Sequence, residues 1–318
     1  MPGILITGIA GGLSRKVAQK LVASGHEVAG VDYRHAAALD GVTMYKASYN
    51  KTAIEDVFRR QQPDAVLHLG RIGNLAEDAE WRFEMNVVGT QKIMHLCLQY
   101  KVKSLSVLST FHIYGANPRN HIPISEEDVV RSGPEFPEIA DAIQLDNMAT
   151  TWVHQYRDVR VVVLRPTNVV GPSIQNTMSR LLRLSRVPSF PGFNPMVQFI
   201  HEDDLTDAVI AAQAGSGRGV FNVAGGAAVP WRTALELAGA RTFPIPSTLM
   251  KLYLRVFSEI PAYLVNFFKY PCVISDQAFR KAFDWESKMC TRQTLWETVK
   301  GVGPAAQADN RGEVSATG

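Results

Sequence analysis

The sequence GILITGIAGGLSRKVAQKLVAS, residues 3–24, decides the fold of the chain. A short apolar run leads into a glycine-rich turn, after which Leu13, Val17 and Leu21 recur at helical spacing in a helix predicted for 13–24. A strand, a glycine turn and a helix in this order bring backbone amides and the positive end of the helix dipole close to a pyrophosphate. The turn is a weak signal alone, so its interpretation depends on the residues that follow.

The next apolar run, residues 27–32, ends in Asp32, where a carboxylate can accept hydrogen bonds from the ribose hydroxyls of a dinucleotide. Asp32 repels a 2′-phosphate, and we therefore predict NAD as the cofactor. Arg34 offers a guanidinium that can bind such a phosphate, so NADP stays an alternative.

Short apolar runs alternate with longer helix-like segments to about residue 170, which is typical of a parallel sheet covered on both faces. The predicted strands are 3–7, 27–32, 64–69, 104–109 and 159–165, and a last strand at 218–223 returns to the same sheet. The fold class is an α/β, Rossmann-type doubly wound parallel sheet with a smaller C-terminal substrate lobe. We expect the dinucleotide-binding domain at 1–172 plus about 197–228, the lobe at 173–196 and 229–302, and a disordered tail at 303–318.

Composition excludes several classes of function. Hydrophobic residues make up 46% and charged residues 20% of the chain, which are values of a globular protein, and no apolar run approaches the ~20 residues of a membrane span. The net charge of +3 comes from scattered Lys and Arg, so no nucleic-acid partner is expected. The N-terminus lacks the pattern of a secretion signal, which predicts a cytoplasmic protein. Cys97, Cys272 and Cys290 fit neither a disulfide framework nor a zinc site, and no metal is expected.

Six short motifs follow one another along the chain. They are TGIAGGLS at 7–14, HLG at 68–70, NVVGT at 86–90, STFHIYG at 109–115, LRPTNVVGP at 164–172 and IHEDD at 200–204. In this order they resemble the motifs of the extended short-chain dehydrogenase/reductase family, the NAD-dependent epimerases and dehydratases, over about residues 2–300. The resemblance implies a seven-stranded Rossmann domain, a small substrate lobe, and a homodimer formed through helices near 77–100 and 138–156.

The resemblance also implies a set of cofactor contacts at the glycine turn, at strand ends and beside the nicotinamide. They fall on Gly8, Ala10, Gly11, Gly12, Leu13, Asp32, Tyr33, Arg34, Ser48, Tyr49, Leu69, Gly70, Arg71, Asn86, Ser109, Gln144, Pro166 and Asn168. Ser14 replaces the last glycine of the family's turn, and Ala47-Ser48 replaces a Gly-Asp pair. The adenine therefore loses a carboxylate partner, and we expect weaker binding.

The chemistry of the family requires a Tyr-x-x-x-Lys pair on one helix, in which the phenolate takes the substrate's proton and the ammonium lowers the phenol pKa and holds the ribose. Alignment back from LRPTNVVGP places Ala140 at the Tyr position and Gln144 at the Lys position. A shift of the alignment does not restore the pair, because residues 115–155 contain no Tyr and residues 104–250 contain no Lys.

Thr110 matches the family's Ser or Thr that hydrogen-bonds the reacting oxygen, so one catalytic group survives. His112, Glu138 and Asp141 are candidate replacements for the base, although a loop histidine and first-turn helix carboxylates are more often structural. Loss of a positioned acid–base group costs roughly 10²–10⁴ in rate. We therefore expect ordinary reductase or epimerase turnover to be lost or severely impaired.

Residues 248–268 are helix-like and strongly apolar, more so than a sugar-nucleotide site requires. They fit packing against the sheet, a lipid-like or steroid-like ligand, a membrane-surface contact or a dimer interface.

Two functions stay open. The first is a non-redox dinucleotide-binding protein that acts as a sensor or scaffold. The second is an active, divergent NAD-dependent oxidoreductase or epimerase, acting on a sugar nucleotide or a lipid-like alcohol through another proton acceptor. A third possibility is that the Tyr/Lys pair was removed by engineering, which would give the same residues at these positions.

Overall fold

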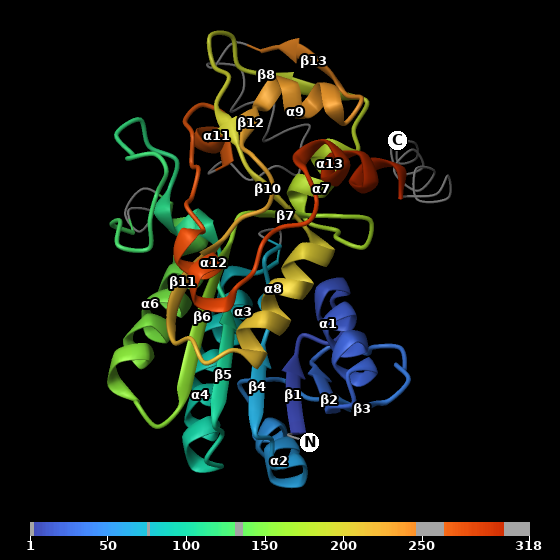
Figure 1. Ribbon diagram of the computed structural model, residues 1–318, viewed down its shortest axis with the longest axis vertical. Coiled ribbons are helices and arrows are strands. Elements are labelled where there is room, and N and C mark those ends of the chain that lie inside the picture. The colour runs from blue at the N-terminus through green and yellow to red at the C-terminus, as the bar shows by residue number, and fades with distance from the viewer. Residues whose placement is uncertain (1–2, 75–76, 131–135, 246–263, 302–318) are drawn as a thin grey trace, which may run out of the picture.

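A computed structural model of the chain describes residues 3–74, 77–130, 136–245 and 264–301. Its centre is a seven-stranded sheet in the order β11-β6-β5-β4-β1-β2-β3, and every neighbouring pair is parallel. The strands are β1 Gly3–Thr7, β2 Glu27–Asp32, β3 Val42–Lys46, β4 Ala65–His68, β5 Ser104–Leu108, β6 Arg160–Pro166 and β11 Gly219–Val223. Figure 1 shows a smaller lobe above the carboxyl ends of these strands. The predicted doubly wound α/β fold is confirmed.

The predicted strands agree with the observed ones to within one residue at each end, and the last strand does return to the main sheet beside β6. β3 was not predicted from the sequence. It lies at the edge of the sheet, and its residues are half-buried or exposed, so Val42–Lys46 lacks the apolar run that marks the buried strands.

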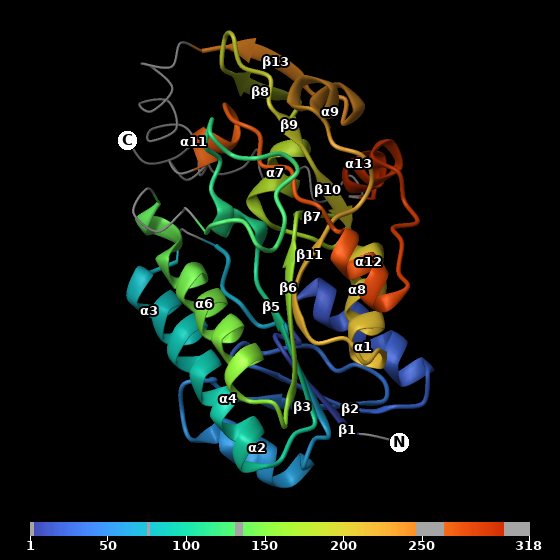
Figure 2. The same cartoon turned by 60° about the vertical axis from the view of Figure 1, so that its left-hand side comes forward.

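Helices cover both faces of the sheet, as Figure 2 shows. One face carries α2 Ala53–Gln61, α4 Gly89–Gln99 and α6 Ala140–Gln155, and the other carries α1 Gly12–Ala23, α8 Glu202–Ala214 and α12 Gln277–Phe283. Alternate residues of one strand serve the two layers, because Leu5 packs with the first set while Ile4 and Ile6 pack with the second. This is why the strands are apolar throughout.

The lobe contains short helices and three two-stranded pairs. The helices are α7 Thr177–Leu182, α9 Trp231–Leu237, α11 Leu264–Phe267 and α13 Thr291–Lys300. The strand pairs are β7 Asn168–Val170 with β10 Phe199–His201, β8 Arg186–Ser189 with β13 Arg241–Pro244, and β9 Met196–Val197 with β12 Val229–Pro230.

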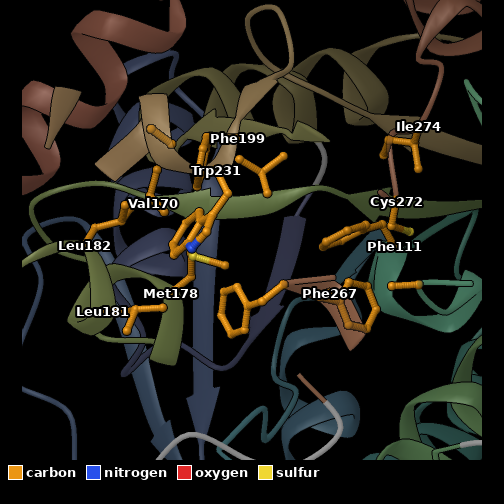
Figure 3. Close-up of a cluster of buried hydrophobic side chains, with 14 of the residues drawn as sticks. Phe111, Val170, Met178, Leu181, Leu182, Phe199, Trp231, Phe267, Cys272 and Ile274 are labelled. Carbon is orange, nitrogen blue, oxygen red and sulfur yellow. The ribbon is translucent and has the colours of Figure 1, made fainter. Parts of the chain in front are cut away.

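A large apolar cluster fills the lobe and reaches the end of β5 (Figure 3). Phe111 and Phe267 lie on one side of the cluster, and Met178, Leu181 and Trp231 lie across it. The lobe core is therefore continuous with the loop that carries the predicted catalytic residue.

Two sequence predictions fall partly or wholly outside the described residues. Of the apolar segment, residues 248–263 lie outside, while Val265, Phe267 and Phe268 are buried in the lobe core. The predicted tail at 303–318 also lies outside. Within the described part of the chain, no helix combines the length and the apolar character needed to cross a membrane.

Candidate functional site

The strand order reverses between β1 and β4, and the loops that leave these two strands meet there. Gly8 has a φ of +75°, and a Cβ at this position would lie 2.5 Å from the Cα of Gly70. Only glycine fits such an approach in this conformation. A crevice at the reversal of strand order is where open α/β sheets bind ligands.

The glycine turn places the amino end of α1 at this reversal of strand order. Gly11 precedes the helix in an extended conformation, and no side chain of the described residues caps the helix there. The Gly11 amide donates to the Gly8 carbonyl oxygen at 2.8 Å, which holds the turn tight. The first amides of α1 therefore keep their capacity to bind an anion.

Asp32 aims its carboxylate at the same turn. The side chain is 1% exposed, and Oδ2 accepts a hydrogen bond from the Ala10 amide at 3.1 Å. Arg34 donates hydrogen bonds to both carboxylate oxygens of Asp32, with Nε 3.2 Å from Oδ1 and Nη2 3.2 Å from Oδ2. The two atoms that would bind ribose hydroxyls are thus paired with a guanidinium, which is itself half-exposed.

Tyr49 supports the turn from the sheet. Its hydroxyl accepts a hydrogen bond from the Gly8 amide at 2.8 Å, and burial raises the pKa of this phenol. Ser48, which replaces the family's carboxylate, donates to the Asn50 side-chain oxygen at 2.8 Å. Tyr33 packs edge to face against Trp81 with ring centres 5.6 Å apart, beside the end of β2.

His68 is a core histidine. Its two ring nitrogens lie 2.8 Å from the hydroxyls of Thr7 and Thr90, and the Thr7 hydroxyl accepts the Gly70 amide at 3.0 Å. Burial lowers the pKa of His68 to about 4, so the ring is neutral at neutral pH. The histidine therefore links β1, β4 and α4.

Asn86 shapes the loop after β4. It lies in the π-helical turn η1 Glu84–Val88, and its side chain pairs with both the amide and the carbonyl of Ile72, at 2.8 and 2.9 Å. It also donates to Asp141 at 2.5 Å, and Asp141 forms a buried ion pair with Arg82 at 3.2 Å. Asp141 is therefore engaged structurally, which argues against its role as a replacement base.

A second buried ion pair, missed from the sequence, lies under Ser109. Asp146 accepts from the Ser109 hydroxyl at 2.6 Å and is held by Arg165 at 2.6 and 3.0 Å. The Arg165 and Asp146 side chains are 4% and 0% exposed. An aspartate among the apolar residues of 140–155 was the available signal, because a buried carboxylate needs a cationic partner.

The predicted Tyr and Lys positions lie at the start of α6. Asp146 faces Ser109, and Ala142, one turn before it on α6, is buried, as residues four apart on a helix share a face. Ala140 and Gln144 are exposed, and so is Glu138, which precedes α6. The assignment of the Tyr and Lys positions to Ala140 and Gln144 stays a prediction.

Thr110 follows β5 and begins the short helix η2 Phe111–Tyr114. Its hydroxyl oxygen lies 2.9 Å from Nδ1 of His112 and accepts the His112 amide at 3.4 Å. Burial, helped by the charge of Arg71, lowers the pKa of His112 to about 3. His112 is thus neutral, and a poor proton acceptor at neutral pH.

The other predicted residues lie at the same edge of the sheet. Pro166 ends β6, and the Asn168 side chain donates to the Gln198 carbonyl at 2.9 Å. Leu69, Gly70 and Arg71 follow β4. Gln144 apart, the predicted residues are brought together along the carboxyl edge. Ser173 and Glu202 were not predicted; Ser173 abuts Gly12, and its hydroxyl binds the buried Glu202 carboxylate.

The fold and this edge define a Rossmann protein built to hold a dinucleotide across the reversal of strand order. The sequence profile described as the NAD dependent epimerase/dehydratase family matches residues 4–224. The chain belongs to this family.

Curated relatives are distant. An uncharacterised protein of Mycobacterium tuberculosis is 26% identical over 210 residues, which cover 63% of this chain and 54% of the relative, so the chain spans about half of that protein's length. Protein CapI of Staphylococcus aureus is 26% identical over 229 residues, covering 65% of this chain and 67% of CapI. UDP-glucuronate 4-epimerase of Thermodesulfobacterium geofontis is 25% identical over 248 residues, which cover 70% of this chain and 75% of the epimerase.

Solved structures share the fold over nearly the whole chain. MoeE5 in complex with UDP-glucuronic acid and NAD superposes with a TM-score of 0.77 at 20% identity, over 96% of this chain and 99% of MoeE5. UDP-glucose 4-epimerase of Thermotoga maritima, solved with UDP-glucose, superposes with a TM-score of 0.76 at 21% identity. The match covers 94% of this chain and 98% of the epimerase.

Proposed function

We propose that the chain is an NAD-binding member of this family that has lost ordinary hydride-transfer turnover. The observation that carries the proposal is the uncapped amino end of α1 with the buried Asp32 carboxylate aimed at the same turn. The amino end of the helix is suited to the pyrophosphate of a dinucleotide, and the carboxylate is suited to the hydroxyls of its ribose. NAD-bound structures of similar fold support the choice of cofactor.

The residues present fit the dinucleotide. The amides that open α1 bind the pyrophosphate, Gly8 and Gly70 let the backbone approach it, and Asp32 accepts the ribose hydroxyls once Arg34 releases them. NAD, when bound, supplies a hydride acceptor. Thr110 then lies at the end of β5, where its hydroxyl can bind the oxygen of a ligand.

The family's usual proton acceptor for that oxygen is missing. Residues 115–155 contain no Tyr and residues 104–250 no Lys, so no register of α6 provides the pair. Of the candidate replacements, Asp141 is held by Arg82 and Asn86, His112 is neutral, and Glu138 is an exposed carboxylate. The missing pair supports a role in sensing the dinucleotide or in scaffolding.

A second candidate is a divergent oxidoreductase or epimerase acting on a sugar nucleotide or another alcohol. The 2.9 Å contact between Thr110 and His112 favours it, because the imidazole and hydroxyl form a possible proton path. The UDP-sugar epimerases among the similar proteins favour it too. The low pKa of His112 weighs against it. Cytoplasmic location and a homodimer through α4 and α6 remain predictions from the sequence.

Reconstruction of the pair tests the proposal. Because Asp146 faces Ser109, we propose that the pair belongs at positions 138 and 142, eight and four residues before it. We expect Glu138→Tyr with Ala142→Lys to gain NAD reduction with an alcohol panel of UDP-glucose, UDP-glucuronate and naphthalenemethanol, followed by nicotinamide absorbance. The matched control, Ala140→Tyr with Gln144→Lys, places the same side chains two residues further along the chain, out of line with Asp146, and should remain inactive. NAD reduction by the unsubstituted protein would contradict the proposal and establish the second candidate.

A further inference from the structure

A buried carboxylate, that of Glu202, is joined to the dinucleotide turn through Ser173. Glu202 is the first residue of α8, and its side chain is 0% exposed. Its two oxygens accept hydrogen bonds from the Ser173 amide, at 3.1 Å, and from the Ser173 hydroxyl. Ser173 abuts Gly12, the first residue of α1, because a Cβ added to Gly12 would lie 2.5 Å from the Ser173 Oγ. The carboxylate therefore holds the side chain against which the amino end of α1 packs.

Lys16 of α1 carries the charge that balances this carboxylate. Its Nζ lies 3.1 Å from Oε1 of Glu202 and 2.6 Å from Oδ1 of Asp203. Lys16 comes one helical turn after Gly12, so the ion pair and the Ser173 contact hold the same end of α1. A buried carboxylate is strongly unfavourable without a cationic partner. Lys16 is thus the group that lets Glu202 stay charged close to the turn.

The charge of Glu202 matters because of what the turn is proposed to bind. A pyrophosphate is negatively charged and binds at the amino end of a helix. An unbalanced carboxylate near that end opposes the ligand, and burial leaves the repulsion poorly screened. A carboxylate balanced by Lys16 can order Ser173 and α1 without repelling the pyrophosphate.

We propose that Glu202 is a positioning residue for the dinucleotide. It holds Ser173 against Gly12, and Lys16 cancels the negative charge that this arrangement places near the pyrophosphate. Glu202 acts through these residues and not by touching the ligand. The inference rests on the proposed function, since it concerns the turn that is proposed to bind NAD. Ser173 follows β7 of the lobe, so the same carboxylate joins the lobe to the turn.

Calorimetric titration of NAD and ADP into the full chain tests the charge balance. Lys16→Met should weaken both ligands by about tenfold, because Glu202 is left without its cation. Lys16→Met with Glu202→Gln removes both charges and keeps a side chain that can hold Ser173, so affinity should return to within about threefold of the unsubstituted protein.

A matched control is available on the same two helices. Lys20 of α1 pairs with Asp207 of α8, one turn further from the glycine turn, and these side chains are 46% and 24% exposed. Lys20→Met removes the same charge from α1 but leaves Glu202 balanced. It should therefore leave NAD affinity within about twofold of the unsubstituted protein.

Adenosine separates the charge effect from damage to the turn. It has the ribose but no phosphate, so its affinity, measured by competition with NAD, should stay within about twofold in Lys16→Met. Ser173→Ala tests the positioning contact without changing any charge, and should weaken NAD by about threefold or more. This variant also provides the test should Lys16→Met not fold.

The outcomes separate this inference from the proposed function. Undiminished NAD binding by Lys16→Met or by Ser173→Ala overturns the inference, and so does an equal loss of adenosine binding. Failure of Glu202→Gln to restore binding overturns it too, because Lys16 would then act on the nucleotide itself. All of these results leave the proposed function intact, whereas failure of the unsubstituted protein to bind NAD overturns both.

Discussion

Arg34 competes with the cofactor for Asp32, and its removal should shift the balance between NAD and NADP. In the structure both Asp32 oxygens accept hydrogen bonds from the guanidinium at 3.2 Å, and the ribose hydroxyls of NAD need the same two atoms. The Arg34 side chain is 51% exposed, so the pair contributes about 0.2–1 kcal/mol. Arg34→Leu should therefore tighten NAD binding by up to about fivefold.

NADP should respond in the opposite direction. Its 2′-phosphate draws Arg34 away from Asp32, and a hydrogen bond to a charged group contributes about 1.5–3 kcal/mol. Arg34→Leu should then weaken NADP by about 10–100-fold, which moves the NAD preference by roughly two orders of magnitude in total.

Calorimetry with both dinucleotides measures the shift. Arg157→Leu removes the same charge from an exposed position after α6 and controls for net charge, and Arg34→Lys should give an intermediate preference, because an ammonium cannot form the two-pronged contact. A preference that stays within about twofold of the unsubstituted protein would refute the competition between Arg34 and the ribose.

Three further predictions concern the framework of the site. Gly8→Ala should destabilise the fold by at least about 1–2 kcal/mol and abolish NAD binding, because the φ of +75° and the contact with Gly70 both exclude a side chain; chemical unfolding and calorimetry measure the two effects. Asp146→Asn should cost about 3–5 kcal/mol in urea unfolding by leaving Arg165 buried without its charge partner, and a loss below 1 kcal/mol would count against a structural role. His68 takes up its proton near pH 6.5 in the unfolded chain but near pH 4 when folded, so its contribution of about 3 kcal/mol is complete above pH 6.5 and is lost as the pH falls toward 4. His68→Gln should flatten this part of the stability profile, and an unchanged slope would contradict the neutral, buried state of the ring.

Most of the fold follows from the apolar runs. Buried parallel strands read as continuous apolar segments, which is why β1, β2, β4, β5 and β6 were found to within one residue. β3 was not predicted because an edge strand with half-exposed residues carries no continuous apolar run. The carboxyl ends of parallel strands lie at one edge, so placing the site residues followed from placing the strands.

Which face of α6 points toward β5 could not be read from the sequence in the same way. The alignment was anchored at LRPTNVVGP, and the length of the connection between α6 and β6 decides which helix positions face β5. Contacts made by Asp146 with Ser109 and Arg165 fix that face, and they join segments far apart along the chain. The pairing of Arg34 with Asp32 was likewise invisible, because a sequence shows two neighbouring charges but not which partner each one takes.

The most direct test of the account is a calorimetric titration of NAD into the full chain, with Asp32→Ala as the paired variant. The account predicts saturable binding of one NAD per chain at micromolar concentrations, weakened by at least about tenfold when Asp32 is replaced. No saturation by NAD, or equal affinity in the Asp32→Ala protein, would contradict the claim that the turn after β1 and the carboxylate after β2 together hold a dinucleotide.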